Sequence, residues 1–369
     1  MRLTLISPTS FAEHSVIGGA ERYTWELARA LARASDVQSV TFLTWGPRSS
    51  VVKREGVLVQ TLRWWPGPRH PLMPDVLRPA LFKAIRSADV VHAFQVDVLS
   101  SNVAVWAAAR IGVPVFVTDL GGGYGRVPST RWPIMRRASG YLLISDYSRR
   151  LWEAAPSFRR PDRLDVIWAG VDTDHFSPGG DPDPTMVVFV GRLVAHKGVE
   201  HVINGLPEGH RLHIIGRPYD QAYLAFLREA ARGKAVTFEH DLDDAALLER
   251  MRRAGAAVLP SVATDYRGCV TVQAELFGLA AAEAMACGTP AIVSDTASLP
   301  EVVADGVTGY VVPAADPQAI GDRLRGLAQN PALRRRLGVQ ARARVLERFT
   351  WDATAARCLE AYRRTGGGR

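Results

Sequence analysis

Cysteines, long apolar runs and secretion signals are all scarce in this chain of 369 residues. The three cysteines (Cys269, Cys287 and Cys358) have no metal-ligand spacing and cannot form a disulfide framework, which fits a reducing compartment. No stretch of about 18 apolar residues occurs, so we expect no transmembrane helix. The first residues, MRLTLISPTS, lack the apolar core and cleavage site of a signal peptide and predict a strand instead. These absences predict a cytoplasmic protein.

Short motifs that mark common ligands are missing too. The chain contains neither the GxGxxG fingerprint of dinucleotide-binding proteins nor a P-loop. Its nine histidines are scattered, and the spacing of His210 and His213 alone does not predict a metal site. The sequence therefore gives no support to a dinucleotide-binding, ATP-binding or metal-binding protein.

The formal net charge of +8 is distributed unevenly. Residues 1–180 hold 22 Lys or Arg against 15 Asp or Glu, whereas residues 181–369 hold 23 against 22. A basic first half indicates an anionic partner such as a membrane, a nucleic acid or an acidic substrate. It equally fits the solvated surface of an arginine-rich protein, since only four of the 45 basic residues are lysines.

Strands and helices alternate along the first half of the chain. A strand at 2–7 is followed by a loop, the glycine pair Gly18 and Gly19, and an amphipathic helix ending near Ser35. This order presents backbone N–H groups to phosphate in α/β proteins. Further strands are expected at 40–45, 57–64, 89–94, 113–118 and 141–145, and helices around 76–87 and 98–110. The alternation predicts a doubly wound, mostly parallel sheet that binds ligands at its carboxyl edge, which includes His92, Thr118, Asp119 and Ser145.

The α/β pattern starts again after a connector rich in Gly, Asp and Pro at residues 166–184. The second set of strands is expected at 186–193, 211–216, 235–240, 256–261 and 290–295, followed by a closing helix at 349–364. A chain of 369 residues is too long for one compact core. We therefore predict two Rossmann-like domains facing a cleft, with a boundary after residue 170.

The stretch from Glu275 to Gly288 has the sequence ELFGLAAAEAMACG. Its Ala and Leu residues predict a helix over 279–286, with Gly288 as the stop. Gly278 lets a ligand approach the first free N–H groups, which favour an anion. Glu275 and Glu283 flank that anion site and would bind hydroxyls, so a phosphorylated sugar fits. The alternative is an Ala-rich core helix with two surface carboxylates.

A basic motif, GRLVAHKG, follows the strand at 186–193 and contains Gly191, Arg192 and Lys197. Arginine supplies a planar fork and lysine a point charge, which together suit a diphosphate leaving group. Charge-assisted hydrogen bonds of about 1.5–3 kcal/mol each would hold that group. The alternative is a pair of surface cations.

In this order, the motifs resemble those of the family-4 glycosyltransferases over nearly the whole chain. The matching pieces are GGAERY, DVVHAF, SDYSRRL, VIWAGVDTDHFSP, VGRLVAHKG, VLPS, ELFGLAAAEAMACGTPAIVSD, LPEVVADGVTGYVV and FTWDATAARCLEAYRR. The resemblance implies the GT-B fold and a retaining transfer of sugar from a nucleotide-diphosphate-sugar to an acceptor hydroxyl. It implies an acceptor-binding domain of residues 1–170 plus 350–369, completed by the closing helix, and a donor-binding domain of residues 171–349.

The resemblance also implies a role for each matching residue. Glu283 would hold the ribose hydroxyls of the donor, and Glu275 the hydroxyls of its sugar. Arg192 and Lys197 would neutralise the diphosphate as the glycosidic bond breaks, so neither a metal nor another cofactor is expected. The implied attack occurs on the same face as the leaving group, without a protein nucleophile. Backbone groups would complete the donor site at Gly18, Gly19, Gly191, Phe277, Gly278 and Leu279.

The segment VFVTDLGGGYG departs from the family pattern. The family often has a histidine there that contacts the donor sugar near its 6-hydroxyl, and Leu120 takes that place here. Leucine would leave a buried hydroxyl unpaired, at a cost of about 1–3 kcal/mol. This departure favours a donor without that hydroxyl, such as a 6-deoxysugar or a pentose. Alternatively, Asp119 or a neighbour replaces the histidine and donor choice is unaffected.

The acceptor is expected on the first domain, near His92, Asp119 and Leu120. Residues 126–160 carry eight arginines against Asp146 and Glu153, with tryptophans between them. Such a surface suits the inner face of an anionic membrane that holds a lipid-linked acceptor. It equally suits a solvated face with buried aromatic residues. Glycan and small-molecule acceptors stay open as well.

Three other functions compete with a glycosyltransferase. A nucleotide-sugar epimerase shares the two-domain architecture, although GRLVAHKG and the glutamate pair argue against it. A nucleotide-sugar-binding protein that lost turnover is kept open by Leu120. A nucleic-acid-binding protein is disfavoured because the basic residues form no recognised binding motif.

Overall fold

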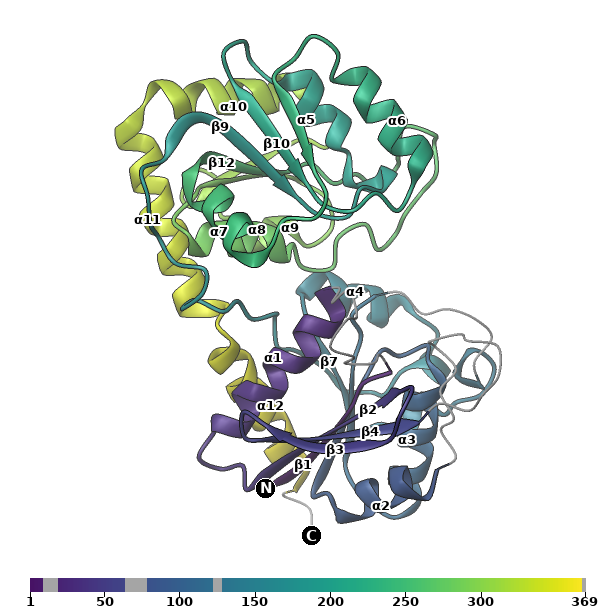
Figure 1. The fold of residues 1–369 in the computed structure, drawn as a ribbon. Coiled ribbons are helices and arrows are strands. Elements are labelled where there is room, and N and C mark those ends of the chain that lie inside the picture. The colour runs from purple at the N-terminus through teal and green to yellow at the C-terminus, as the bar shows by residue number, and fades with distance from the viewer. Residues whose placement is uncertain (9–18, 64–77, 122–127, 367–369) are drawn as a thin grey trace. The chain divides into compact units, whose positions relative to one another are not determined.

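The structure, a computed structural model, describes residues 1–8, 19–63, 78–121 and 128–366. The chain divides into two compact units, shown in Figure 1. One unit contains Met1–Gly170 and Trp351–Arg369, and the other contains Val171–Thr350. No helix of the described ranges is long and apolar enough to cross a membrane.

The first unit is built on an eight-stranded sheet with the order β3-β4-β2-β1-β5-β6-β7-β8. All neighbouring strands are parallel except the edge pair β3 and β4. The strand bounds are β1 Arg2–Ile6, β2 Ser39–Gly46, β3 Ser50–Arg54, β4 Val57–Arg63, β5 Val90–Phe94, β6 Val115–Thr118, β7 Gly140–Leu143 and β8 Leu164–Val166.

Helices cover both faces of this sheet. Apolar side chains of α2 (Pro79–Ser87) and α3 (Leu99–Arg110) pack on one face, and α4 (Asp146–Ala154) adds Trp152 to the same core. The other face carries α1 (Gly19–Arg33) and α12 (Trp351–Gly366), which lie side by side (Figure 1). The closing helix is therefore part of the first unit, although Val171–Thr350 precedes it in the chain.

The second unit has a fully parallel sheet of six strands with the order β11-β10-β9-β12-β13-β14. The strands are β9 Asp183–Val190, β10 Arg211–Ile215, β11 Val236–Glu239, β12 Ala254–Leu259, β13 Ala291–Ser294 and β14 Gly309–Val312. Its helices are α5 Val199–Gly205, α6 Gln221–Ala230, α7 Asp244–Arg253, α8 Leu279–Ala286, α9 Leu299–Val302, α10 Pro317–Gln329 and α11 Pro331–Arg348.

Alternate residues of β9 explain the two layers of helices in this unit. Val187 and Phe189 point into a core shared with α5, α6 and α10. Val188 points to the opposite face, where it meets Ala284 of α8 and Leu247 of α7. Figure 1 shows α5 and α10 on one side of the sheet and α7 and α8 on the other. A strand buried on both faces has the continuous apolar sequence expected in a parallel sheet.

The prediction of two doubly wound, mostly parallel sheets is confirmed. The helix predicted at 279–286 is α8, and Gly288 follows it in the left-handed region at φ +80°. Strand β3 was not predicted because all five of its side chains are exposed, so it has no apolar alternation. The predicted strand at 256–261 begins and ends two residues earlier, as β12.

Candidate functional site

The two motifs predicted to bind the donor follow neighbouring strands of the second unit. From β9 the chain adds β10 and β11 on one side, and it then returns to place β12 on the other side of β9. Ligands of doubly wound sheets bind outside the carboxyl ends of the strands at such a reversal of strand order. GRLVAHKG follows β9, and the segment that leads to Glu275 follows β12. Topology alone therefore places both motifs at the expected ligand-binding edge.

Lys197 and Glu275 form an ion pair at this edge. Lys197 Nζ donates to Glu275 Oε2 over 2.5 Å, and the side chains are only 13% and 14% exposed. Ser261, two residues after the end of β12, donates its hydroxyl to the same oxygen over 3.4 Å. Two residues predicted for the donor site thus lie in contact. Because both side chains are largely buried, dissolved salt screens their charges little.

Close backbone packing positions Lys197. The next residue, Gly198, has φ +60°, and a Cβ atom there would lie 2.3 Å from the carbonyl oxygen of Pro260. The N–H of Val262 donates to the carbonyl oxygen of His196 over 2.8 Å. The loop after β9 and the loop after β12 are therefore fastened together on both sides of Lys197.

The charges around His196 define the electrostatics of the site. Burial, together with the cations Lys197 and Arg192, lowers the pKa of His196 to about 4, against weaker opposing effects of Glu275 and Asp265. His196 is therefore neutral at pH 7. Arg192 is exposed, and its guanidinium lies 6.0 Å from the centre of the Tyr219 ring. Two cations and two carboxylates thus surround a neutral imidazole, and their formal charges balance.

Helix α8 begins at this site without a side-chain cap. Gly278 precedes it at φ +92°, where a Cβ atom would lie 2.7 Å from Leu299 Cδ2. Leu279 is half-buried at the first helical position, and Glu283 is buried one turn further on. The first N–H groups of a helix carry a partial positive charge and favour anions.

Gly191 and Phe277, two further positions of the predicted donor site, make contacts inside the second unit. The N–H of Gly191 donates to Ile215 O over 3.0 Å. The Phe277 ring is buried and packs edge-on against Phe349, with ring centres 5.3 Å apart. The Phe277 ring is therefore taken up by packing inside the unit.

The predicted residues of the first unit lie on several strands. Gly18 lies outside the described residues, and the exposed Gly19 opens α1. His92 is buried in β5, with Nδ1 2.7 Å from Tyr362 Oη and Nε2 2.8 Å from Thr118 Oγ1. Burial lowers its pKa to about 3. The Nδ1 contact therefore holds α12 to the sheet, the Nε2 contact joins β5 to β6, and neither nitrogen is left for an acceptor.

Asp119 and Leu120 follow β6. The Asp119 carboxylate is buried, and it accepts hydrogen bonds from Trp152 Nε1 over 3.0 Å and from the N–H of Gly121 over 3.3 Å. Burial raises the pKa of this carboxyl. Leu120 is half-buried. Both carboxylate oxygens of Asp119 are thus directed into the protein.

The sequence did not single out Ser261 or the hairpin that follows it. The hairpin has a bridge between Thr264 and Val270, and its Tyr266 stacks on Phe226 of α6 with ring centres 4.3 Å apart. Ser261 ends the motif VLPS directly after a buried strand, and this position at a strand end is the signal that could have identified it.

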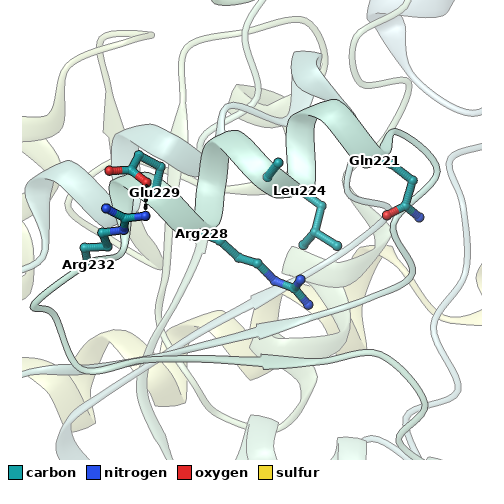
Figure 2. Close-up of a pocket in the computed structure, with 6 residues that line it drawn as sticks. Gln221, Leu224, Arg228, Glu229 and Arg232 are labelled. Carbon is teal, nitrogen blue, oxygen red and sulfur yellow. Dashed lines mark ion pairs between the residues drawn. The ribbon is translucent and has the colours of Figure 1, made fainter.

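A separate depression runs along one side of α6 (Figure 2). It is lined by Gln221, Leu224, Ala225, Arg228, Glu229 and Arg232. Arg232 pairs with Glu229 over 2.9 Å, as the dashed line in Figure 2 marks. None of the predicted site residues lines this depression. In the part of the chain that the structure describes, no group of three or more His, Cys, Asp or Glu side chains is arranged to hold a metal ion.

Comparison with known proteins identifies the family of this chain. The family described as Glycosyltransferase Family 4 matches residues 17–175, and that described as Glycosyl transferases group 1 matches residues 171–344. An alpha-maltose-1-phosphate synthase of Mycobacterium tuberculosis is 30% identical, covering 67% of this chain and 68% of its own. A D-inositol 3-phosphate glycosyltransferase of Paenarthrobacter aurescens is 27% identical, covering 95% of this chain and 94% of its own.

A solved structure shows the same fold. The Anabaena protein HepE, in complex with UDP-glucose, superposes with a TM-score of 0.69 at 16% identity, covering 97% of this chain and 99% of its own. The predicted GT-B fold is thereby confirmed. Sequence and fold together show that this chain belongs to glycosyltransferase family 4 and is a glycosyltransferase that uses a nucleotide-sugar donor.

Proposed function

We propose that this enzyme transfers a sugar with retention of anomeric configuration and without a metal, using the Lys197–Glu275 pair as the centre of its donor site. The observation that carries the proposal is the position of this pair at the strand-order reversal, where α8 begins without a side-chain cap. A diphosphate would receive charge from Lys197 and Arg192, and N–H groups from the start of α8. These cationic groups supply the stabilisation that a metal supplies elsewhere.

The transfer step needs no protein nucleophile. The bond between the anomeric carbon and the diphosphate oxygen breaks, and the electron pair leaves with the diphosphate. The acceptor oxygen bonds to the anomeric carbon on the same face, and a departing phosphate oxygen takes up the hydroxyl proton. Lys197 and Arg192 stabilise the negative charge that grows on the leaving group, so they act most strongly in the transition state.

The two glutamates have different proposed partners. Glu275 accepts hydrogen bonds from hydroxyls of the donor sugar while its other contacts, Lys197 and Ser261, fix the carboxylate. Glu283, buried one turn into α8, holds the ribose hydroxyls of the nucleotide. Since Leu120 cannot form a hydrogen bond, we further propose a donor sugar without a 6-hydroxyl, a 6-deoxyhexose or a pentose.

The proposed acceptor is a hydroxyl group on a glycan, a lipid-linked molecule or a natural product, reached in the cytoplasm or at the inner face of the membrane. The names of the two relatives include a sugar phosphate and an inositol phosphate. A phosphorylated polyol therefore belongs in any acceptor panel. It is also the small-molecule acceptor class that the basic first half of the chain would attract.

The proposal is tested by a screen of nucleotide sugars read by release of the nucleoside diphosphate, with and without acceptors. We expect release that depends on the acceptor, and a product whose anomeric configuration equals that of the donor. An unchanged rate after treatment with EDTA is expected. Conversion of the donor sugar without an acceptor would support an epimerase instead, and UDP binding without any release would support a protein that only binds nucleotide sugars.

Glu283→Ala is the site-specific arm of this test. Loss of the ribose contact should raise the donor KM at least about ten-fold, because a hydrogen bond to a charged group contributes about 1.5–3 kcal/mol. Its matched control is Glu249→Ala, an exposed glutamate of α7. Equal KM values in both variants would contradict the assignment of Glu283.

A further inference from the structure

Among the described arginines of residues 128–160, some are held in ion pairs and others are not. Arg149 pairs with Asp146 over 3.0 Å and with Glu153 over 2.6 Å. Arg159 pairs with Asp97 over 2.8 Å. Arginines held in this way have much of their charge compensated inside the first unit. Their long-range attraction for an anionic surface is therefore reduced.

A second group is exposed and uncompensated. Arg131, Arg136 and Arg137 form no ion pair or hydrogen bond with the residues that the structure describes, and residues 128–137 contain no carboxylate. Between them lies Trp132, whose 65% exposure is the highest among the described tryptophans. We call Arg131, Trp132, Arg136 and Arg137 the Trp132 surface.

The Trp132 surface is part of a firmly packed segment. Met135 is fully buried in the core beneath it, and the two 3₁₀ turns, η1 (Pro128–Thr130) and η2 (Met135–Arg137), contact α3. The N–H of Ser129 donates to Asn102 Oδ1 over 2.8 Å. The backbone beneath the exposed side chains is therefore fixed, so binding has to order the side chains and not the segment as well.

Helix α3 adds a second exposed indole next to this segment. Trp106 lies one turn beyond Asn102, the residue that binds η1, and is 42% exposed. The guanidinium of Arg110 lies 5.0 Å from the centre of its ring. Two exposed tryptophans accompanied by arginines thus belong to the same part of the first unit.

Indole rings and unpaired guanidinium groups together match one environment. Tryptophan is enriched at the interface of a bilayer, where its apolar body is buried and its N–H stays wet. Arginine is attracted to anionic head groups, and each such residue strengthens binding about five-fold. In water, the exposed indole and the unpaired guanidinium groups gain neither contribution.

We propose that the Trp132 surface docks this enzyme on an anionic membrane. The use of a lipid-linked acceptor at the membrane rests on the proposed function, whereas the docking itself does not. The surface binds peripherally, through head-group contacts of Arg131, Arg136 and Arg137 and through insertion of the Trp132 ring. The membrane-binding group is thus distinct from the arginines that pair with Asp97, Asp146 and Glu153.

The experiment measures co-sedimentation of the full chain with phosphatidylglycerol–phosphatidylcholine vesicles and with vesicles of phosphatidylcholine alone. The test variant is Arg131→Gln/Arg136→Gln/Arg137→Gln. The matched control is Arg228→Gln/Arg335→Gln/Arg336→Gln, which removes the same charge from exposed arginines of the second unit that form no ion pair with a described residue. UDP affinity is measured for all three proteins.

We expect the wild type and the control to bind anionic vesicles, and the test variant to bind about 100-fold more weakly. UDP affinity should be equal in all three proteins, so a failure of the proposed donor site is distinguishable from a failure of docking. Quenching of tryptophan fluorescence by brominated phosphatidylglycerol should decrease in Trp132→Phe.

Three results would overturn the proposal. The wild type could fail to sediment with anionic vesicles. The test variant and the control could lose binding equally, which would indicate diffuse attraction by net charge. A single-stranded oligonucleotide could bind through these three arginines while vesicles bind equally well without them, which would indicate a nucleic-acid site. Equal quenching in the wild type and Trp132→Phe would contradict insertion of the ring.

Discussion

Lys197 Nζ and Glu275 Oε2 lie 2.5 Å apart, although 78 residues separate them in the chain. The sequence assigned them separate partners, the lysine to a diphosphate and the glutamate to a sugar. The structure adds that each is the other's counter-ion at the carboxyl edge of β9 and β12. A diphosphate sugar fits this arrangement because its anionic centre and its hydroxyls can contact the two groups side by side.

Removing the charge of Lys197 should slow the reaction far more than it weakens donor binding. We expect Lys197→Met to lower kcat about 100- to 1000-fold, the effect of losing one group that stabilises charge in the transition state. Donor KM should change only a few-fold. Steady-state kinetics with the donor identified in the screen measures both values. Lys53→Met, at an exposed lysine of β3, is the control.

The same pair predicts the effect of Glu275→Gln, which keeps the size of the side chain and removes its charge. Lys197 then lacks its counter-ion, so UDP should bind at least as tightly while kcat decreases through the lost contact to the sugar. Weaker UDP binding together with an unchanged kcat would contradict the division of roles between these two residues.

Gly198→Ala should damage both stability and turnover. Alanine at φ +60° costs about 1–2 kcal/mol, and its Cβ would collide with Pro260 O at 2.3 Å. Gly209→Ala is the matched control, because Gly209 has φ +77° and nothing within 4 Å of the added Cβ. Urea unfolding should show a larger loss for Gly198→Ala, and kcat should decrease in that variant alone. Equal losses in both variants would show that the contact with Pro260 is unimportant.

His92 should make stability depend on pH. Burial lowers its pKa to about 3, whereas the unfolded chain binds the proton near pH 6.5. Between these values the unfolded state binds more protons, so the free energy of unfolding decreases as the pH falls, by up to about 1.4 kcal/mol per pH unit. Above about pH 6.5 this contribution is fully present.

His92→Gln should therefore be less stable than the wild type at pH 7, with a difference that shrinks as the pH approaches 4. Urea midpoints measured from pH 4 to 7 give the comparison. Thr118→Val removes a hydrogen-bond partner of the ring but keeps the histidine, so it should retain the wild-type slope. Parallel pH profiles for the wild type and His92→Gln would exclude this explanation.

Leu120→His should change donor choice. The wild type is expected to prefer a 6-deoxyhexose or pentose donor. In the variant, kcat/KM for the matching hexose donor should rise about ten-fold or more. The reason is that a restored hydrogen bond contributes about 0.5–1.5 kcal/mol and an unpaired hydroxyl costs about 1–3 kcal/mol. The matched control is Leu120→Met, which keeps an apolar side chain of similar volume. Comparable turnover of both donor classes by the wild type would remove the basis for this prediction.

The sequence predicted the elements whose side chains are buried on both faces. The continuous apolar runs of β9 and β12 and the Ala-rich α8 were recognisable because burial leaves a regular pattern in the residue types. The exposed edge strand β3 carries no such pattern, so only its pairing with β4 identifies it. Boundaries were shifted by up to three residues, as at β9, which was expected at 186–193 and spans Asp183–Val190.

The side-chain contacts of the candidate site could be predicted only in part. Glu275 and Lys197 could be named from their motifs, whereas Ser261 and the Gly198–Pro260 contact depend on two loops that meet only in the folded unit. The buried environment of His92 likewise depends on α12, which returns to the first unit after Thr350. No local pattern could show that this histidine would meet Tyr362.

The sequence by itself therefore determined the family, the doubly wound fold class and the chemical types of the candidate site residues, because local pattern and residue order carry that information. Only the tertiary structure decided which charges compensate one another. It paired Lys197 with Glu275 and Arg159 with Asp97, and it left Arg131, Arg136 and Arg137 without a counter-ion among the described residues. The physical reason is that ion pairs depend on distances of a few ångströms between residues far apart in the chain, and such distances are set by the packing of the whole unit.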